Sequence, residues 1–127
     1  MIAAELGGGG AVDPGITDAA EAGLYRILRH QGVLPGDAPQ RDQTRRIEIV
    51  SIDHSLFAPG EGVFDRRISA GQDVKAGDIA GTLHFVAEPR RASEVIRFNY
   101  DGFVLAHTQR GYVTRGDMLM LLVQDTS

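Results

Sequence analysis

Apolar residues recur at spacings of three and four along the segment that follows the first glycine run of the chain. They are Ile16, Ala19, Ala20, Gly23, Leu24, Ile27 and Leu28. This spacing places them on one face of an amphipathic helix. Asp13-Pro14 supplies a capping side chain followed by a proline at the first helical position, and Gly32 with Pro35-Gly36 is a stop signal. The pattern predicts a helix from about Asp13 to Gln31.

A short apolar run, Met1 to Leu6, precedes that helix and leads directly into the four glycines Gly7 to Gly10. It reads as a buried strand that ends in a loop. One strand and one helix cannot bury the apolar face of the helix by themselves. We therefore expect residues 1–36 to be the edge of a larger α/β domain.

The pattern of apolar residues changes after a polar, proline-containing stretch at residues 36–44, which has the composition of a linker. From Ile47 onward, short β-branched and aromatic runs alternate with glycine turns. We place the domain boundary in the polar stretch and expect residues 37–127 to form a β-rich domain. The predicted class is mainly β with one N-terminal helix.

The β-rich part contains an imperfect repeat with a spacing of 40 residues, which drops to 39 after a one-residue deletion. Gly62-Val63-Phe64 through Gly71, Val74 and Gly77-Asp78 recurs as Gly102-Phe103-Val104 through Gly111, Val113 and Gly116-Asp117. In each copy a Gly-Asp turn starts another apolar strand. Two such halves can pack face to face.

This repeat resembles the barrel-sandwich hybrid of the biotinyl and lipoyl carrier domains over about residues 58–124. Carrier domains attach their prosthetic group to a lysine in the hairpin that links the halves. The corresponding link, about Val86 to Val95, contains no lysine, and Lys75 in the Val74 to Gly77 turn is the only lysine of the chain. We expect Lys75 to be a solvated surface residue, and biotin or lipoyl attachment is disfavoured.

Composition narrows the functional classes further. The 127 residues include 43% hydrophobic residues, no cysteine, and a net charge of −4. This is the composition of a folded globular chain, without thiolate metal sites or disulfides. We expect a cytoplasmic protein that neither binds nucleic acid nor spans a membrane, because there is no basic surface, long apolar run or secretory signal. The paired arginines at 45–46, 66–67 and 90–91 suit a solvated face, with a partner or a carboxylated ligand as the alternative.

Candidate chemistry is sparse. The histidines His30, His54, His84 and His107 have no metal-ligand spacing, so we expect no metal site in this chain. Nucleophile-elbow and phosphate-loop motifs are also missing. What remains is Glu5 at the end of an apolar strand, followed by glycines whose backbone can approach a ligand closely. The residues alone are also consistent with a solvated Glu5 that precedes a flexible glycine loop. A third possibility is an anion site at the N-terminus of the helix, but the negative charge of Asp13 would repel an anion there.

The Glu5-Leu6-Gly7 motif, the glycine run, the helix and the following β-rich domain together resemble the succinylglutamate desuccinylase/aspartoacylase family. The likeness is to bacterial deacetylase-like members that act on N-acyl diamino acids, and it covers essentially the whole chain. Leu56-Phe57-Ala58-Pro59 and Arg115-Gly116-Asp117 add modest support.

The resemblance implies that residues 1–36 are the C-terminal edge of a carboxypeptidase-like catalytic domain. In that domain a His-x-x-Glu pair and a later His bind zinc, all upstream of Met1. It implies that Glu5 is the catalytic base and then acid, taking a proton from the zinc-bound water and delivering one to the leaving amine. Gly7, Gly8 and Gly9 would form the loop beside the substrate, an N-acyl amino acid. This piece alone would be inactive, and the apolar helix face makes a homo-oligomer plausible.

A stand-alone β-rich binding module, without enzymatic activity, is the alternative. Such a module would not need the strand and helix that precede it. That segment therefore favours the hydrolase interpretation.

Overall fold

The computed structural model describes residues 12–39 and 45–126. Contacts divide the chain into two units, Met1–Thr44 and Arg45–Ser127. The predicted strand at residues 1–6 lies outside the described residues. The assignment of residues 1–36 to a catalytic domain remains a prediction.

The described part of the first unit is dominated by helix α1, Pro14–His30. Asp13 caps it, because its Oδ1 accepts a hydrogen bond of 2.9 Å from the backbone N–H of Ile16. Beyond its end Gly32 takes a φ of 70°, the left-handed conformation that favours glycine. The predicted helix and both of its boundary signals are confirmed. Within residues 12–39, no residue of α1 is buried.

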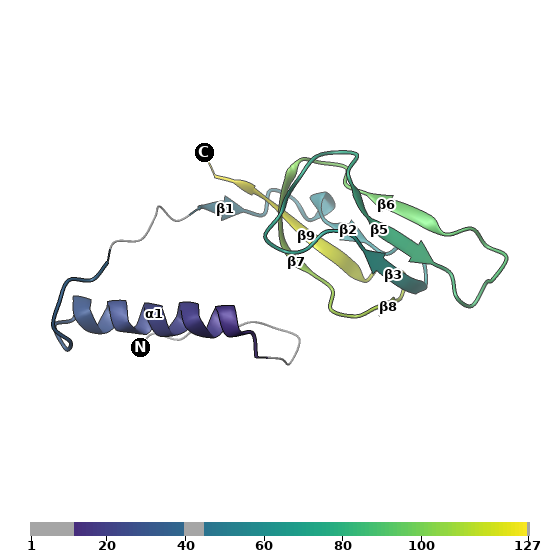
Figure 1. Ribbon diagram of the computed structural model, residues 1–127. Helices are drawn as coiled ribbons and strands as arrows, with labels where there is room; N and C mark the ends of the chain where they lie inside the picture. The colour runs from purple at the N-terminus through teal and green to yellow at the C-terminus, as the bar shows by residue number, and fades with distance from the viewer. Residues whose placement is uncertain (1–11, 40–44, 127) are drawn as a thin grey trace. The chain divides into compact units, whose positions relative to one another are not determined.

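The second unit consists of short antiparallel strands in two sheets (Figure 1). The elements are β1 (Ile47–Glu48), the 3-10 helix η1 (Ile52–His54), β2 (Leu56–Phe57), β3 (Gly62–Arg66), β4 (Asp73–Val74), β5 (Ile79–His84), β6 (Glu94–Arg97), β7 (Gly102–His107), β8 (Tyr112–Val113) and β9 (Met118–Asp125). One sheet has the order β1-β9-β7-β4, with β2 also paired to β9. The other has the order β6-β5-β3-β8.

The predicted repeat is an internal pseudo-two-fold relation between these sheets. In the first half β3 pairs with β5 of its own half and with β8 of the other, and in the second half β7 pairs with β9 and with β4. The registers match: Phe64 lies opposite Leu83 as Val104 lies opposite Leu122. Each half therefore completes the sheet that the other half begins.

The two Gly-Asp turns are built alike. Gly77 and Gly116 have φ values of 93° and 89°, and the aspartate that follows each glycine closes the turn. Asp78 Oδ2 accepts from the Lys75 N–H at 2.8 Å, and Asp117 Oδ2 accepts from the Thr114 N–H at 2.8 Å. The repeated motif in the sequence is thus a repeated turn with the same hydrogen bond.

A single core cluster draws its apolar side chains from both sheets. Its largest fully buried members include Leu83 from one sheet and Val104, Leu119 and Leu122 from the other. The predicted class, mainly β with one helix, is confirmed, and the strand pairs are antiparallel. Within residues 45–126 neither sheet closes on itself, and the barrel-sandwich hybrid remains a prediction.

Candidate functional site

The residues expected to carry chemistry, Glu5 with Gly7, Gly8 and Gly9, lie outside the described residues. Their roles therefore remain predictions. The structure instead shows a cluster of charged residues at one end of the β unit, where the chain enters it.

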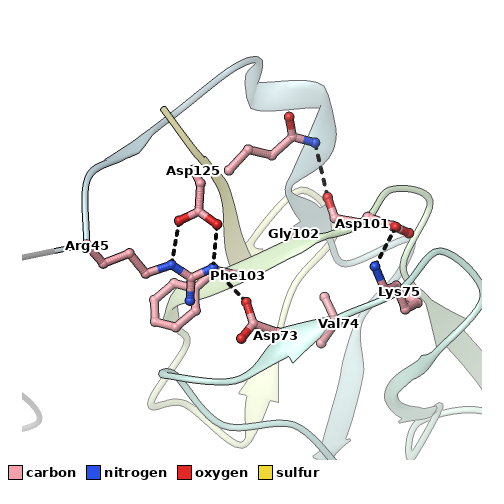
Figure 2. A pocket seen from close by; sticks show the side chains of 9 residues that line it. Arg45, Asp73, Val74, Lys75, Asp101, Gly102, Phe103 and Asp125 are labelled. Atoms are coloured by element: carbon pink, nitrogen blue, oxygen red, sulfur yellow. Dashed lines mark hydrogen bonds and ion pairs between the residues drawn. The ribbon is translucent and has the colours of Figure 1, made fainter. Parts of the chain in front are cut away.

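This cluster lines a surface cavity of about 360 Å³ (Figure 2). The lining comes from the segment before β1, strand β4 with the turn after it, the start of β7 with the residue before it, and the end of β9. The lining residues are Arg45, Asp73, Val74, Lys75, Asp101, Gly102, Phe103, Gln124 and Asp125.

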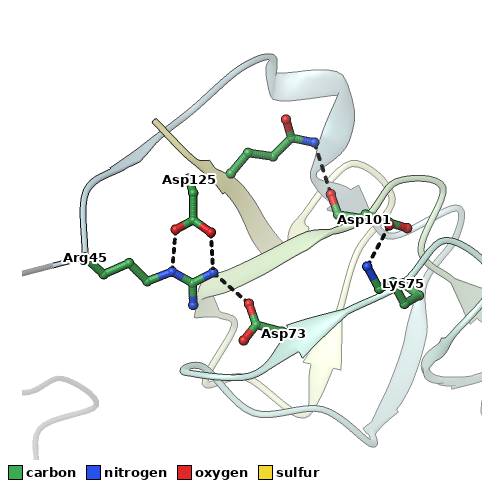
Figure 3. Close-up of polar contacts among 6 residues, drawn as sticks. Arg45, Asp73, Lys75, Asp101 and Asp125 are labelled. Carbon is green, nitrogen blue, oxygen red and sulfur yellow. Dashed lines mark hydrogen bonds and ion pairs between the residues drawn. The ribbon is translucent and has the colours of Figure 1, made fainter. Parts of the chain in front are cut away.

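Arg45 is the centre of the cluster. Its Nε donates to Asp125 Oδ1 at 2.5 Å and its Nη2 donates to Asp125 Oδ2 at 3.0 Å, a bidentate pair (Figure 3). The same Nη2 donates to Asp73 Oδ1 at 2.7 Å. The guanidinium also lies 4.3 Å from the centre of the Phe103 ring. One side chain thus joins the beginning of the unit to strands β4 and β9 and to the start of β7.

Asp101 organises the other side of the cavity. Its carboxylate accepts from Lys75 Nζ at 2.9 Å and from the Ala76 N–H at 2.8 Å. Its backbone carbonyl accepts from Gln124 Nε2 at 3.1 Å. Lys75 is solvated as predicted, with 77% of its side chain exposed, but it is also paired.

These contacts keep the cavity charged at neutral pH. Hydrogen bonds to Asp125 and Asp73 raise the pKa of Arg45, and the bond to Asp101 raises the pKa of Lys75. The hydrogen bond from Arg45 lowers the pKa of Asp125. The hydrogen bond from the Ala76 N–H has the largest effect in lowering the pKa of Asp101, and the hydrogen bond from Lys75 lowers it further. All four groups are therefore poor proton donors or acceptors near pH 7, and the arrangement suits holding the chain rather than acid–base catalysis.

The same shifts predict acid sensitivity of the β unit. Asp101, Asp117 and Asp125 have lowered pKa values in the folded state, so their stabilising effect is complete above the ordinary aspartate pKa of about 3.9 and is lost as pH falls through the folded values. We expect the urea midpoint to be flat from about pH 7 to 5 and to fall below about pH 4. Asp117→Asn should flatten that fall; an equally steep fall in the variant would contradict the assignment.

Three of the described histidines make contacts that are separate from one another. The His54 ring stacks on Tyr100 with centroids 3.9 Å apart, His84 Nδ1 lies 2.9 Å from Ser93 Oγ, and His107 Nδ1 lies 2.9 Å from the Thr108 carbonyl. Across residues 12–39 and 45–126, no three His, Cys, Asp or Glu side chains gather to bind a metal. Nor does any helix in these ranges have the length and apolar character to cross a membrane.

Sequence reasoning placed Arg45 in a solvated arginine pair and did not identify the network. Its partner Asp125 is 80 positions away. Side chains so far apart in the sequence become neighbours only through the β4-β7-β9 pairing.

A curated protein and several solved structures are similar to this chain. The chain is 25% identical over 126 residues to the N-alpha-acetyl-L-2,4-diaminobutyric acid deacetylase of Halomonas elongata, covering 98% of this chain. It superposes on the succinylglutamate desuccinylase/aspartoacylase structure from Rhodobacter sphaeroides with a TM-score of 0.81, at 30% identity over 96% of this chain. The product-bound ectoine utilization protein EutE (DoeB) from Ruegeria pomeroyi gives a TM-score of 0.76, at 28% identity over 94% of this chain.

The chain spans only part of these relatives. It covers 36% of the Halomonas deacetylase, 39% of the Rhodobacter chain and 36% of the Ruegeria chain, and it matches their C-terminal portion. No family model matches the chain.

Proposed function

Because the chain belongs to the succinylglutamate desuccinylase/aspartoacylase family, we propose that it is the C-terminal part of a hydrolase that removes an acyl group from an N-acylated amino acid. The observation that carries this proposal is the extent of the match to deacylases, 96% of this chain for the Rhodobacter structure and 98% for the Halomonas deacetylase. Such a match spans both the helix-bearing unit and the β unit. A stand-alone β module would resemble its relatives over the second unit only.

In the proposed reaction Glu5 is the general base and then the general acid. It takes a proton from the attacking water, whose oxygen bonds to the acyl carbon, and it gives a proton to the amine nitrogen as the carbon–nitrogen bond breaks. Both protons are accounted for, and the products are a carboxylic acid and a free amino acid. The glycines at 7–9 suit this role, because residues without side chains leave room for a substrate beside the carboxylate.

Zinc does not fit the described residues, which contain no suitable group of ligands. We propose that the metal is bound by residues outside this chain. They would belong to the region that corresponds to the part of the relatives not covered by the match. When bound, zinc would polarise the acyl carbonyl and acidify water. The 127 residues alone would then be inactive.

We propose that the β unit is an accessory domain of the barrel-sandwich hybrid type. The pseudo-two-fold pairing supports this, since each half contributes a strand to the sheet of the other. The unit has its own core, which is also what an independent binding module would have. The hydrolase and the binding-module hypotheses therefore predict different activities, but both predict that the β unit folds.

A deacylation assay tests the proposal. N-acetyl and N-succinyl amino acids, including acetylated diamino acids, would be supplied to this chain and to a version extended upstream in its reading frame, called the extended protein below. We expect release of free amino acid by the extended protein only. If neither protein releases amino acid from any substrate, the binding module becomes the better account.

A further inference from the structure

We infer that Arg45, Asp73, Phe103 and Asp125 form a salt-labile latch that fixes where the polar segment at 37–44 joins the β unit. In the closed latch Arg45 is held against β4, β7 and β9. In the open latch the chain around Arg45 and Arg46 is released while the two sheets stay intact. This inference concerns the β unit alone and does not depend on the proposed activity.

The geometry of the latch ties the start of the unit to two distant strands. Arg45 reaches Asp125 across 80 residues and Asp73 across 28 residues of chain. The backbone continues the connection, because the Thr126 N–H donates to the Arg46 carbonyl at 3.0 Å and Ile47 pairs with Asp125. Strand β1 has only two residues, so the side-chain contacts of Arg45 add to a short backbone pairing.

The pseudo-two-fold counterpart of the latch has the same strand pairing with different side-chain contacts. The pairing of Asp73 with Phe103 is repeated at the other end of the unit by Tyr112 with Val63. There the Tyr112 hydroxyl donates to Glu61 instead of joining a network of ion pairs. The counterpart pairing therefore forms without a network of ion pairs like that of Arg45. Among the described residues, the network stands only at the end where the polar segment enters.

The exposure of the latch makes it sensitive to salt. The side chains of Arg45, Asp73 and Asp125 are 40%, 71% and 60% exposed. Ion pairs in such positions are weak and are screened as the Debye length falls from about 10 Å at 0.1 M salt to about 3 Å at 1 M. The buried residues of the core are not screened. Salt is thus expected to open the latch before it affects the sheets.

Trypsin cleavage measures latch opening directly. The protease must insert an arginine side chain into its own pocket, and Arg45 in the closed latch is bound to two carboxylates and a ring. The double variant Asp73→Asn/Asp125→Asn should raise the rate of cleavage after Arg45 and Arg46 by at least about fivefold, because cleavage follows the population of the open form. Intact-mass spectrometry of the cleavage products identifies the arginine after which the chain was cut. In about 1 M NaCl the wild-type rate should approach that of the double variant.

Two controls separate the latch from general destabilisation. Asp65→Asn removes the 3.0 Å pair between Arg67 and Asp65, an exposed ion pair at the end of β3, and should leave cleavage after Arg45 and Arg46 unchanged. Cleavage after Arg66 and Arg67 reports opening of the sheet and should not increase in the double variant. Cleavage of the double variant after Arg45 and Arg46 at the wild-type rate would refute the latch. An equal relative increase in the cleavage rates after Arg66 and Arg67 would also refute it, because it would mean that the whole unit is destabilised.

Discussion

Glu5→Gln in the extended protein is expected to lower kcat/KM by about 10²-fold to 10⁴-fold, the usual contribution of general acid–base catalysis. Glutamine keeps the size of the side chain but can neither accept the proton of the attacking water nor return one to the leaving amine. Steady-state kinetics on the best substrate of the acylated amino acid panel measures the loss.

The matched control is Glu21→Gln, which makes the same chemical change at an exposed residue of helix α1. It should leave kcat/KM at the wild-type value. Bound zinc should be equal in the wild type and both variants, because the proposed ligands lie elsewhere. Wild-type turnover by Glu5→Gln would remove Glu5 from the mechanism, and loss of zinc in that variant would give it a different role.

Gly102→Ala is expected to lower the free energy of unfolding of the β unit by more than about 2 kcal/mol. A methyl group at this position would lie 2.7 Å from the Val123 carbonyl oxygen and 2.8 Å from Leu122 Cγ. Strands β7 and β9 would have to separate to admit it. The backbone φ is ordinary here, so the cost comes from the close approach of the strands. Urea unfolding followed by circular dichroism measures it.

Two further glycines provide internal controls for that experiment. Gly62, the pseudo-two-fold counterpart of Gly102, would meet the His84 backbone, and Gly62→Ala should be at least as destabilising. Gly111 has open space and an ordinary φ, so Gly111→Ala should leave stability unchanged or raise it by up to about 1 kcal/mol. Equal effects at Gly102 and Gly111 would show that the close strand contact is not what requires glycine.

Much of the fold could be predicted because its signals are local. The cap at Asp13, the apolar spacing and the stop at Gly32 define α1 within a few residues of chain. The Gly-Asp turns at 77–78 and 116–117 are local for the same reason, since each aspartate bonds to an N–H three residues before it. Their recurrence also revealed the repeat.

The order of the strands could not be read in this way. The repeat predicts two halves, but not that β4 pairs with β7 and β8 with β3, because the exchange depends on packing between residues some 30 to 50 positions apart. The Arg45 network depends on that exchange and was missed for this reason. A pair of arginines beside a polar segment has the same local pattern whether both are solvated or one is held by two carboxylates.

The most direct test of the account is the zinc content of the extended protein and of this chain, each purified without chelator and then assayed for deacylation. We expect about one zinc per extended protein, with activity that is lost on chelation and restored by zinc, and neither metal nor activity in the 127-residue chain. An extended protein without zinc, or one whose deacylase activity persists after the metal is removed, would contradict it.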